Sequence, residues 1–396
     1  MKDEKKAPKL RFKGFTDDWK QCKLGDVADI TTGSRNHQDS VTDGKYPFFV
    51  RSDKVERLNE YDFDTRAILV PGDGRIGEIF HYYNGKFALH QRVYKVDNFD
   101  GINALFLLGK FKYSFKKHAL RLNAQGTVPS LRLPMFTNWN ISIPNITEQE
   151  RIGSFFRKLD RTITLHEEKE RQLERLKSAL LQKMFADQGG YPPVRFEGFS
   201  DEWKIFKLSS LATMHARIGW QNLRTSEFLS HGKYMLITGT DFNNGQIDFS
   251  TCHYVEKERY EQDKHIQIKN GSILITKDGT LGKVAYVQGL SKPATLNAGI
   301  FNIEIRNENE IDRTYLFQYL KAPYLMNYVQ ERATGGTIKH LNQSILKSFP
   351  VQIPNKIEQN KIGELITKLD HLINLQRKKL NNIAALKNSL LQSMFI

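Results

Sequence analysis

The chain contains one sequence pattern twice, and this duplication constrains its architecture more than any local signal. The stretch Gly14-Phe15-Thr16-Asp17-Asp18-Trp19-Lys20 returns as Gly198-Phe199-Ser200-Asp201-Glu202-Trp203-Lys204. A second landmark, Ile143-Pro144-Asn145 followed by Glu148-Gln149 and Ile152-Gly153, returns as Ile353-Pro354-Asn355, Glu358-Gln359 and Ile362-Gly363. The repeat is much longer than the repeats that build solenoids. We therefore expect two copies of one unit, each made of a globule and a helix.

The two copies differ in length between these landmarks. Phe15 and Phe199 are 184 positions apart, whereas Gly153 and Gly363 are 210 positions apart. The second copy therefore holds about 26 additional residues between the landmarks. The two copies therefore agree in sequence at their ends and differ in the middle. This suggests a common frame that carries two different contact surfaces.

The charge of the chain favours a polyanionic partner. The formal net charge is +15 and the sequence pI is about 9.5, which is typical of nucleic-acid-binding proteins. A basic surface without any such role is the alternative. Because the segment Met1–Lys6 is charged and lacks an apolar core, we do not expect it to be a secretory signal. No apolar run approaches the ~20 residues of a membrane span. With only Cys22 and Cys252, one in each copy, we expect a cytoplasmic protein without a disulfide framework.

Each globule is predicted to be a mixed α/β (α+β) domain. Short runs rich in β-branched and aromatic residues alternate with Gly, Asn and Asp turns, as in Tyr46–Val50, Ala67–Val70, Tyr234–Ile237 and Ile300–Ile305. The aromatic and basic stretch Phe111–Lys117 fits either a nucleic-acid surface or an amphipathic helix with a basic outer face.

A long helix is predicted after each globule. The first helix opens near Thr147, which forms a capping box with Glu150. Apolar residues then recur at steps of three and four, which predicts a coiled-coil seam. The seam positions are Ile152, Phe156, Leu159, Ile163, Leu173, Leu176, Leu180, Met184, Ile362, Ile366, Leu369, Ile373, Ile383, Leu386, Leu390 and Met394.

The simplest partner for each helix is the other helix, running antiparallel. In that register the residue numbers of two facing positions add up to about 546. The acidic centre of the first helix, Glu167–Glu170, then faces the basic centre of the second, Arg377–Lys379. Packing of each helix back on its own globule is the alternative. The predicted boundaries are residues 1–145 for the first globule, 146–187 for its helix, 188–193 for a linker, 194–355 for the second globule and 356–396 for its helix.

We find no catalytic motif in the sequence. Asp278–Lys283 is too short for a phosphate-binding loop. Gly72–Gly77 has the spacing of a dinucleotide-binding motif, but its counterpart at Asp278–Gly282 favours a hairpin turn. The histidines show no paired metal-ligand spacing. We therefore expect no catalytic residue and no metal site in this chain.

Taken together, these motifs resemble those of the DNA specificity subunit of type I restriction-modification enzymes. The order of the motifs carries the resemblance: the Gly-Phe entry, a Gly-Thr turn, the Ile-Pro helix start and a Leu-Leu-Gln-x-Met-Phe helix end. The Gly-Thr turn stands at Gln125–Leu131 and at Gly335–Leu341, and the helix end stands at Leu180–Phe185 and at Leu390–Phe395. The set covers essentially the whole chain.

This resemblance implies a non-catalytic role in DNA methylation and restriction. Each globule would be a target recognition domain that reads one half of a bipartite, asymmetric site on double-stranded DNA. The paired helices would hold the domains apart and dock two methyltransferase subunits, which bind S-adenosylmethionine and methylate adenine. Two restriction subunits can join such a complex. No cofactor would be bound by this chain itself.

Polar loop residues are the candidates for DNA contact, because base edges are read by Arg, Lys, Asn, Gln and Thr side chains. Trp220 could instead be a core residue. The Gly-Thr turns could instead have a purely structural role. Trp19 and Trp203 are expected to be packing anchors. The candidates are Arg35, Asn36, Arg51, Lys54, Arg75, Gln125, Thr127, Arg217, Trp220, Asn222, Lys277, Thr280, Thr337 and Lys339.

Two other functions remain open from the sequence. The chain could be a stand-alone nuclease with two lobes, or a coiled-coil scaffold whose globules bind protein.

Overall fold

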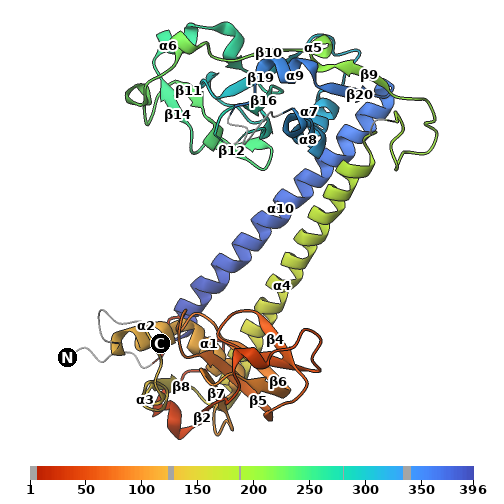
Figure 1. Ribbon diagram of the computed structural model, residues 1–396. Coiled ribbons are helices and arrows are strands. Elements are labelled where there is room, and N and C mark those ends of the chain that lie inside the picture. The colour runs from red at the N-terminus through yellow and green to blue at the C-terminus, as the bar shows by residue number, and fades with distance from the viewer. Residues whose placement is uncertain (1–6, 124–128, 187–188, 280, 333–339) are drawn as a thin grey trace. The chain divides into compact units, whose positions relative to one another are not determined.

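The computed structural model describes residues 7–123, 129–186, 189–279, 281–332 and 340–396. The chain forms two compact units. Unit 1 comprises Met1–Glu168 and Arg377–Ile396, and unit 2 comprises Lys169–Gln376. Each unit therefore contains one globule, one half of the long helix α4 (Ile146–Lys183) and one half of the long helix α10 (Lys356–Met394) (Figure 1).

Unit 1 is built on a six-stranded sheet in the order β2-β7-β5-β6-β3-β4. Neighbouring strands are antiparallel except for β3 and β6, which are parallel. A separate two-stranded sheet pairs β1 with β8. The strands are β1 (Lys20–Lys23), β2 (Asp29–Thr32), β3 (Tyr46–Phe49), β4 (Val55–Leu58), β5 (Phe63–Pro71), β6 (His81–Leu89), β7 (Val93–Asp97) and β8 (Asn140–Ile143).

Helices pack against this sheet and complete the core of unit 1. Phe111 and Phe115 are fully buried, whereas Lys116 and Lys117 are exposed. The stretch Phe111–Lys117 therefore has the geometry of the amphipathic alternative, with a basic outer face. The helices are η1 (Leu24–Asp26), η2 (His37–Asp39), α1 (Ala104–Lys110), the π-helical η3 (Phe111–Phe115), α2 (Lys116–Leu122) and α3 (Leu133–Thr137).

Unit 2 repeats this plan with two four-stranded sheets, β10-β19-β16-β17 and β14-β11-β18-β15, and the two-stranded pairs β12-β13 and β20-β9. Its strands are β9 (Lys204–Lys207), β10 (Ala212–His215), β11 (Tyr234–Ile237), β12 (Phe242–Asn243), β13 (Gln246–Ile247), β14 (His253–Val255), β15 (Gln267–Ile268), β16 (Ile273–Thr276), β17 (Val284–Tyr286), β18 (Ala294–Leu296), β19 (Ile300–Ile305) and β20 (Pro350–Ile353). Its helices are α5 (Leu208–Leu211), η4 (Gly219–Gln221), η5 (Thr225–Glu227), η6 (Gly239–Asp241), α6 (Lys257–Glu261), η7 (Lys264–Ile266), α7 (Arg313–Lys321), α8 (Pro323–Glu331) and α9 (Gln343–Ser348).

The additional residues of unit 2 are spread over several connections of its sheets. In unit 1, β3, β4 and β5 follow one another directly. In unit 2, η6 and the hairpin β12–β13 stand between β11 and β14, and α6, η7 and β15 stand between β14 and β16. The strand β6, which pairs with both β5 and β3, corresponds to two separate strands, β17 and β18. The middle of the repeat therefore differs in structure as well as in sequence.

The start of each long helix is capped by an asparagine. The Asn145 side chain accepts a hydrogen bond from the Glu148 backbone N–H at 3.0 Å, and Asn355 accepts the same bond from Glu358 at 3.0 Å. The predicted capping box of Thr147 and Glu150 is wrong, because α4 already begins at Ile146 and Thr147 lies inside its first turn. The cap belongs to the Ile-Pro-Asn motif itself.

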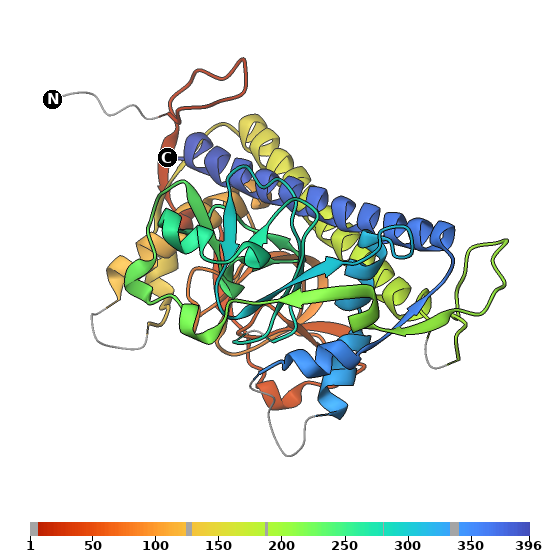
Figure 2. The same cartoon turned by 90° about the horizontal axis from the view of Figure 1, so that it is seen from above.

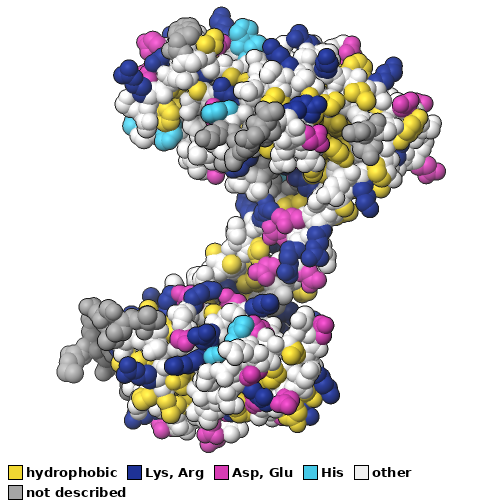
Figure 3. Space-filling view, viewed as in Figure 1, with side chains coloured by type: hydrophobic (Ala, Val, Ile, Leu, Met, Phe, Trp, Pro, Cys, Tyr) yellow, Lys and Arg dark blue, Asp and Glu magenta, His cyan; other side chains and the backbone are white. Residues whose placement is uncertain are grey.

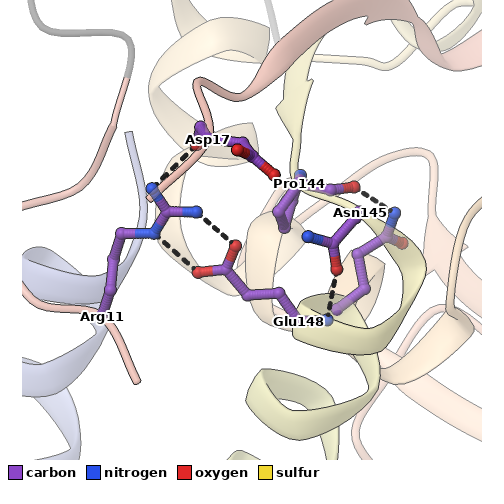
Figure 4. A network of polar contacts seen from close by, with 6 residues as sticks. Arg11, Asp17, Pro144, Asn145 and Glu148 are labelled. Carbon is purple, nitrogen blue, oxygen red and sulfur yellow. Dashed lines mark hydrogen bonds and ion pairs between the residues drawn. The ribbon is translucent and has the colours of Figure 1, made fainter. Parts of the chain in front are cut away.

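A fully buried carboxylate follows this cap in both units. Figure 4 shows the one in unit 1, Glu148, with Arg11 and Asn145. Glu148 is 0% exposed and receives two hydrogen bonds from Arg11, at 2.9 and 2.6 Å. Glu358 is also 0% exposed and receives two from Arg195, at 2.7 and 2.8 Å. A buried carboxylate is tolerated only when it is paired and hydrogen-bonded. The bidentate arginine–glutamate contact therefore connects the segment before each globule to the start of its helix.

The next residues of the motif fix the helix to its own globule. Gln149 accepts a hydrogen bond from the Asn103 backbone N–H at 2.8 Å and donates to the Pro144 carbonyl at 2.9 Å. Gln359 makes the equivalent bonds to Asp312 at 2.7 Å and to Pro354 at 2.9 Å. We call this set of contacts, which includes the arginine–glutamate pair and Gly153 or Gly363, the helix joint.

The end of each long helix enters the core of the unit in which it terminates. In unit 1 the Phe395 ring lies 5.3 Å from Phe106 and 5.7 Å from Phe156. In unit 2 the Phe185 ring lies 5.5 Å from Tyr315 and 5.2 Å from Tyr319. The Leu-Leu-Gln-x-Met-Phe motif is therefore an anchor.

Trp19 and Trp203 are buried in the same two cores. The prediction that both are packing anchors is confirmed.

Within each unit, the segments of α4 and α10 run antiparallel and lie side by side (Figures 1 and 2). Lys387 forms an ion pair with Asp160 in unit 1, and Lys177 forms the equivalent pair with Asp370 in unit 2. The residue numbers of each pair total 547, which agrees with the predicted register of about 546. Asp160 also pairs with Lys112 at 2.8 Å, and Asp370 with Lys321 at 3.4 Å, so one aspartate joins both helices and the globule.

The predicted seam is buried at its ends and opens at one position of each helix. Leu176 is 49% exposed and Leu386 is 53% exposed. They directly precede Lys177 and Lys387, whose ammonium groups reach across to the facing helix. The prediction that Leu176 and Leu386 are seam positions is therefore corrected, because both side chains are exposed. The remaining seam residues are buried or partly buried, and Met184 lies one residue beyond the end of α4.

Substitution of Gly153 tests how closely the helix packs against the globule at the helix joint. A Cβ atom at this position would lie 2.7 Å from the Phe106 backbone nitrogen and 2.8 Å from the Leu105 Cβ. We expect Gly153→Ala to lower the free energy of unfolding by roughly 1–3 kcal/mol through overpacking, measured by urea denaturation. Ser154→Ala, at an exposed position of the same helix, is the matched control and should change stability little. Equal stability of the two variants would contradict a tight joint.

Substitution of Asp370 tests how much its ion pairs with the globule and with α4 stabilise unit 2. Burial alone would raise the pKa of Asp370, but Lys321 and Lys177 outweigh it, so the pKa lies below its ordinary value. The stabilisation is therefore present at neutral pH and is lost as the pH falls through the lowered pKa. We expect Asp370→Asn to cost about 2 kcal/mol at pH 7, somewhat less than breaking a fully buried pair, and the difference from wild type to shrink below about pH 4.

The control for this experiment is Glu364→Gln, which breaks an exposed pair with Lys368. Exposed pairs contribute only a few tenths of a kcal/mol. If both substitutions had the same small effect at pH 7, the three-way contact of Asp370 would not stabilise the unit.

Candidate nucleic-acid interface

Two loops come together at the same place in both units. In unit 1 the turn after β5 contacts the segment that leads into α3, with the Leu131 N–H donating to the Gly72 carbonyl at 2.6 Å. In unit 2 the turn after β16 contacts the segment before α9, with the Leu341 N–H donating to the Lys277 carbonyl at 2.8 Å. We call each pair of segments a loop cluster. It brings the turn that carries Arg75 or Lys277 to the end of the Gly-Thr segment.

The turn Gly72–Gly77 is a hairpin turn, as predicted. It joins the antiparallel strands β5 and β6, and no helix follows it, so it lacks the geometry of a dinucleotide-binding loop. Gly74 and Gly77 have φ values of 74° and 66°, and Gly279 and Gly282 have 72° and 71°. Glycine adopts this left-handed conformation without the strain that a side chain would cause.

Ion pairs cross between the loops of unit 1. Arg51 contacts Asp73 at 3.2 Å, and Arg75 contacts Asp53 at 2.7 Å. Arg75 also contacts Glu78 at 3.0 Å, and Lys116 contacts the same carboxylate at 2.5 Å. Hydrogen bonds from Lys116 and then Arg75 lower the pKa of Glu78. Arg51 and Arg75 remain 52% and 63% exposed, so both can reach a ligand.

The other candidates of unit 1 lie on neighbouring loops. Arg35 is held by Asp62 at 2.8 Å and by Glu60 at 2.9 Å. The Asn36 side chain accepts a hydrogen bond from Gln91 at 2.5 Å and is exposed, as is Lys54. No described contact joins Arg35 or Asn36 to the Arg51–Arg75 pair.

In unit 2 the loop cluster borders a cleft of about 660 Å³. Its walls include Lys277, whose ammonium group lies 5.5 Å from the centre of the Phe301 ring. They also include His340, whose Nδ1 lies 2.6 Å from Asp278, and His215, which stacks on His265 at 4.7 Å. None of these histidines was among the candidate residues predicted from the sequence. Only the position of His340, directly after the predicted Lys339, could have indicated one of them.

Arg217 has a different place from the one predicted. It is 2% exposed and donates to the Leu296 carbonyl at 2.9 Å, to Gln262 at 3.2 Å and to Thr295 at 3.3 Å. Burial lowers its pKa. Its donors face protein oxygen atoms, so the structure gives it the role of holding the η4 loop, and we no longer regard it as a base-reading residue. Asn222, which follows η4, is exposed.

The remaining candidates lie outside the residues that the structure describes, or have no described side chain. They stay predictions, as do their structural alternatives. They are Gln125, Thr127, Thr280, Thr337 and Lys339, together with the side chain of Trp220.

The described surface mixes basic and acidic side chains. Figure 3 shows Lys and Arg spread over the visible face of each unit, interspersed with Asp and Glu. Among the described residues, no group of three or more His, Cys, Asp or Glu could hold a metal ion. No described helix is both long and apolar enough to cross a membrane.

Comparison with known proteins shows the family. Residues 16–175 and 200–385 match the type I restriction modification DNA specificity domain, once in each copy of the repeat. The chain is 24% identical to the type I restriction enzyme EcoDI specificity subunit of Escherichia coli, over 95% of this chain and 87% of that protein. It is 22% identical to the MjaVIII specificity subunit of Methanocaldococcus jannaschii, over 95% and 91%.

A solved structure shares the fold. The crystal structure of a type I restriction-modification S subunit from M. genitalium has a TM-score of 0.70 with 19% sequence identity and covers 98% of this chain and 99% of that one. Two matches of the family domain span most of the sequence. The chain therefore belongs to the type I restriction-modification DNA specificity family, and it is the specificity subunit of such a system.

Arg217→Ala tests the structural role of this arginine. Removing the side chain leaves buried oxygen atoms without donors, so we expect a loss of roughly 2–4 kcal/mol in the free energy of unfolding, measured by urea denaturation. Arg224→Ala, at an exposed position of the same segment, should change stability by less than about 0.5 kcal/mol. Wild-type stability of Arg217→Ala combined with a loss of sequence preference would restore Arg217 as a base reader.

Proposed function

We propose that this chain is a non-catalytic subunit whose two domains read the two different halves of one bipartite site on double-stranded DNA. The contrast between the two loop clusters supports this proposal. The helix joints share the same set of hydrogen bonds in both units, whereas the loop clusters differ in their polar side chains. The loop cluster of unit 1 carries Arg75, with Arg51 of the neighbouring loop bound to its Asp73, and the loop cluster of unit 2 carries Lys277 and His340. One frame with two different sets of polar side chains suits recognition of an asymmetric site.

The long helices supply the second part of the proposed function. We propose that their length sets the unread spacer between the half-sites and that their outer faces dock two methyltransferase subunits. Those subunits would bind S-adenosylmethionine and methylate adenine, and two restriction subunits could join them. The exposed apolar residues Leu372 and Leu375 of α10 support docking of a protein there.

Domain exchange tests the assignment of one half-site to each domain. Residues 1–145 are replaced by the first domain of another family member, and the chain is produced with its methyltransferase partner. We expect the methylated motif, mapped by sequencing of modified adenines, to change in one half only, because each loop cluster reads its own bases. Exchange of residues 194–355 is the matched control and should change the other half only.

A change in both halves after one exchange would contradict the proposal. The two remaining functions have their own readouts. Metal-dependent cleavage of DNA by the isolated chain would favour the nuclease. A partner complex without any affinity for DNA would favour the scaffold.

A further inference from the structure

Two arginines of unit 1 are each held by a carboxylate of the opposite loop. Arg51 follows β3 and contacts Asp73 of the hairpin turn, and Arg75 of that turn contacts Asp53 of the loop after β3. A guanidinium carries five N–H donors. The described bonds use one donor of Arg51 and two of Arg75. The carboxylates therefore orient both side chains and leave donors for a ligand.

The charges of this cluster argue against a phosphate as that ligand. Arg51, Arg75 and Lys116 are matched one for one by Asp53, Asp73 and Glu78. A phosphate group would be attracted by the cations and repelled by three carboxylates that lie within ion-pair distance of them. A surface that binds the DNA backbone normally carries an excess of positive charge. The three cations and three carboxylates of these ion pairs carry no such excess among themselves.

The edge of a G·C base pair fits the same cluster better. In the major groove, guanine offers two acceptors, O6 and N7, and cytosine offers one donor, its N4 amino group. An arginine fork binds the two guanine acceptors, and a neighbouring carboxylate can accept from the cytosine. A base pair has no net charge in the groove, so an electrically balanced set of donors and acceptors is a suitable partner.

Unit 2 has no arginine at either corresponding position. Thr238-Gly239 follows β11 where Val50-Arg51 follows β3, and the turn after β16 has Thr280 in the place of Arg75. Asp278, the counterpart of Asp73, contacts His340 instead. Asp241, the counterpart of Asp53, is buried and accepts hydrogen bonds from Thr238 and Thr251. Arginines held by carboxylates, as Arg51 and Arg75 are, therefore occur at these positions in unit 1 only and do not belong to the frame that the two units share.

We propose that Arg51 and Arg75 are the base-reading residues of the first domain, that each reads the guanine of a G·C pair, and that Asp73 and Asp53 position them. The inference rests on the proposed function and names the bases that this domain takes. The half-site read by unit 1 then contains at least two G·C pairs. The half-site read by unit 2 is recognised by other side chains.

The test maps methylated adenines for complexes that contain wild type, Arg51→Gln or Arg75→Gln. The exchange of residues 1–145 identifies which half-site belongs to unit 1. We expect each variant to relax one G·C position of that half by about 10- to 100-fold, the range for loss of one good base contact, and to leave the other half unchanged. Arg57→Gln, an exposed arginine on β4, is the matched control and should leave the motif intact.

A unit 1 half-site without G·C pairs would overturn the inference. So would variants that weaken binding to all DNA equally, since that is the behaviour of a phosphate contact. If the domain exchange itself changed both halves, the proposed function would fail. If the exchange changed one half and the arginine variants relaxed no G·C position, only the guanine assignment would fail.

Asp73→Asn tests the positioning role separately. Discrimination at the position read by Arg51 should fall, whereas affinity for random DNA should rise, because a negative charge is removed from the interface. Both quantities are measured by titration of labelled DNA with the methyltransferase complex at fixed salt. A fall in both would indicate a damaged fold, and unchanged discrimination would show that Asp73 does not position Arg51. Unchanged discrimination therefore overturns the role proposed for Asp73.

Discussion

The buried carboxylate at the start of each long helix is the contact on which the rest of the structure depends. Glu148 and Glu358 have no exposed surface, and their charges would be too costly without Arg11 and Arg195. Each pair joins the segment before the globule to the helix, and the adjacent Gln149 or Gln359 joins the helix to the globule. Loss of the arginine would leave its carboxylate buried without a partner. The position of the entry segment is therefore coupled to the position of the helix.

This joint separates the frame of each unit from its variable part. The hairpin β12–β13 and the segment α6–η7–β15 occur only in unit 2, yet the bonds of Gln359 and Asn355 reproduce those of Gln149 and Asn145. Additional residues are accepted in the middle because the joint involves none of them. Under the proposed function, this independence lets one frame carry two different reading surfaces. It also explains why the duplication is visible in sequence only at its ends.

The candidate site was predictable in part. The turn after β5 and the Gly-Thr segment were selected from sequence as polar loops, and the structure brings the described ends of both together. Arg217 shows the limit of such reasoning. It stands before Ile218 and Gly219 in a segment that looks like any exposed polar loop, yet it is buried among carbonyl and side-chain oxygens. Burial depends on Leu296 and Thr295, which lie almost 80 residues further along the chain.

The sequence by itself determined the duplication, the two long helices and their antiparallel register, because repeats and apolar periodicity are local patterns that survive in the linear order of residues. Tertiary structure alone decided which polar residues are buried and which of them pair. Arg11 with Glu148, Lys387 with Asp160 and Arg51 with Asp73 are contacts between distant segments. The free energy of such a pair depends on its solvent exposure and on the separation of its atoms. Only the folded chain sets those two quantities.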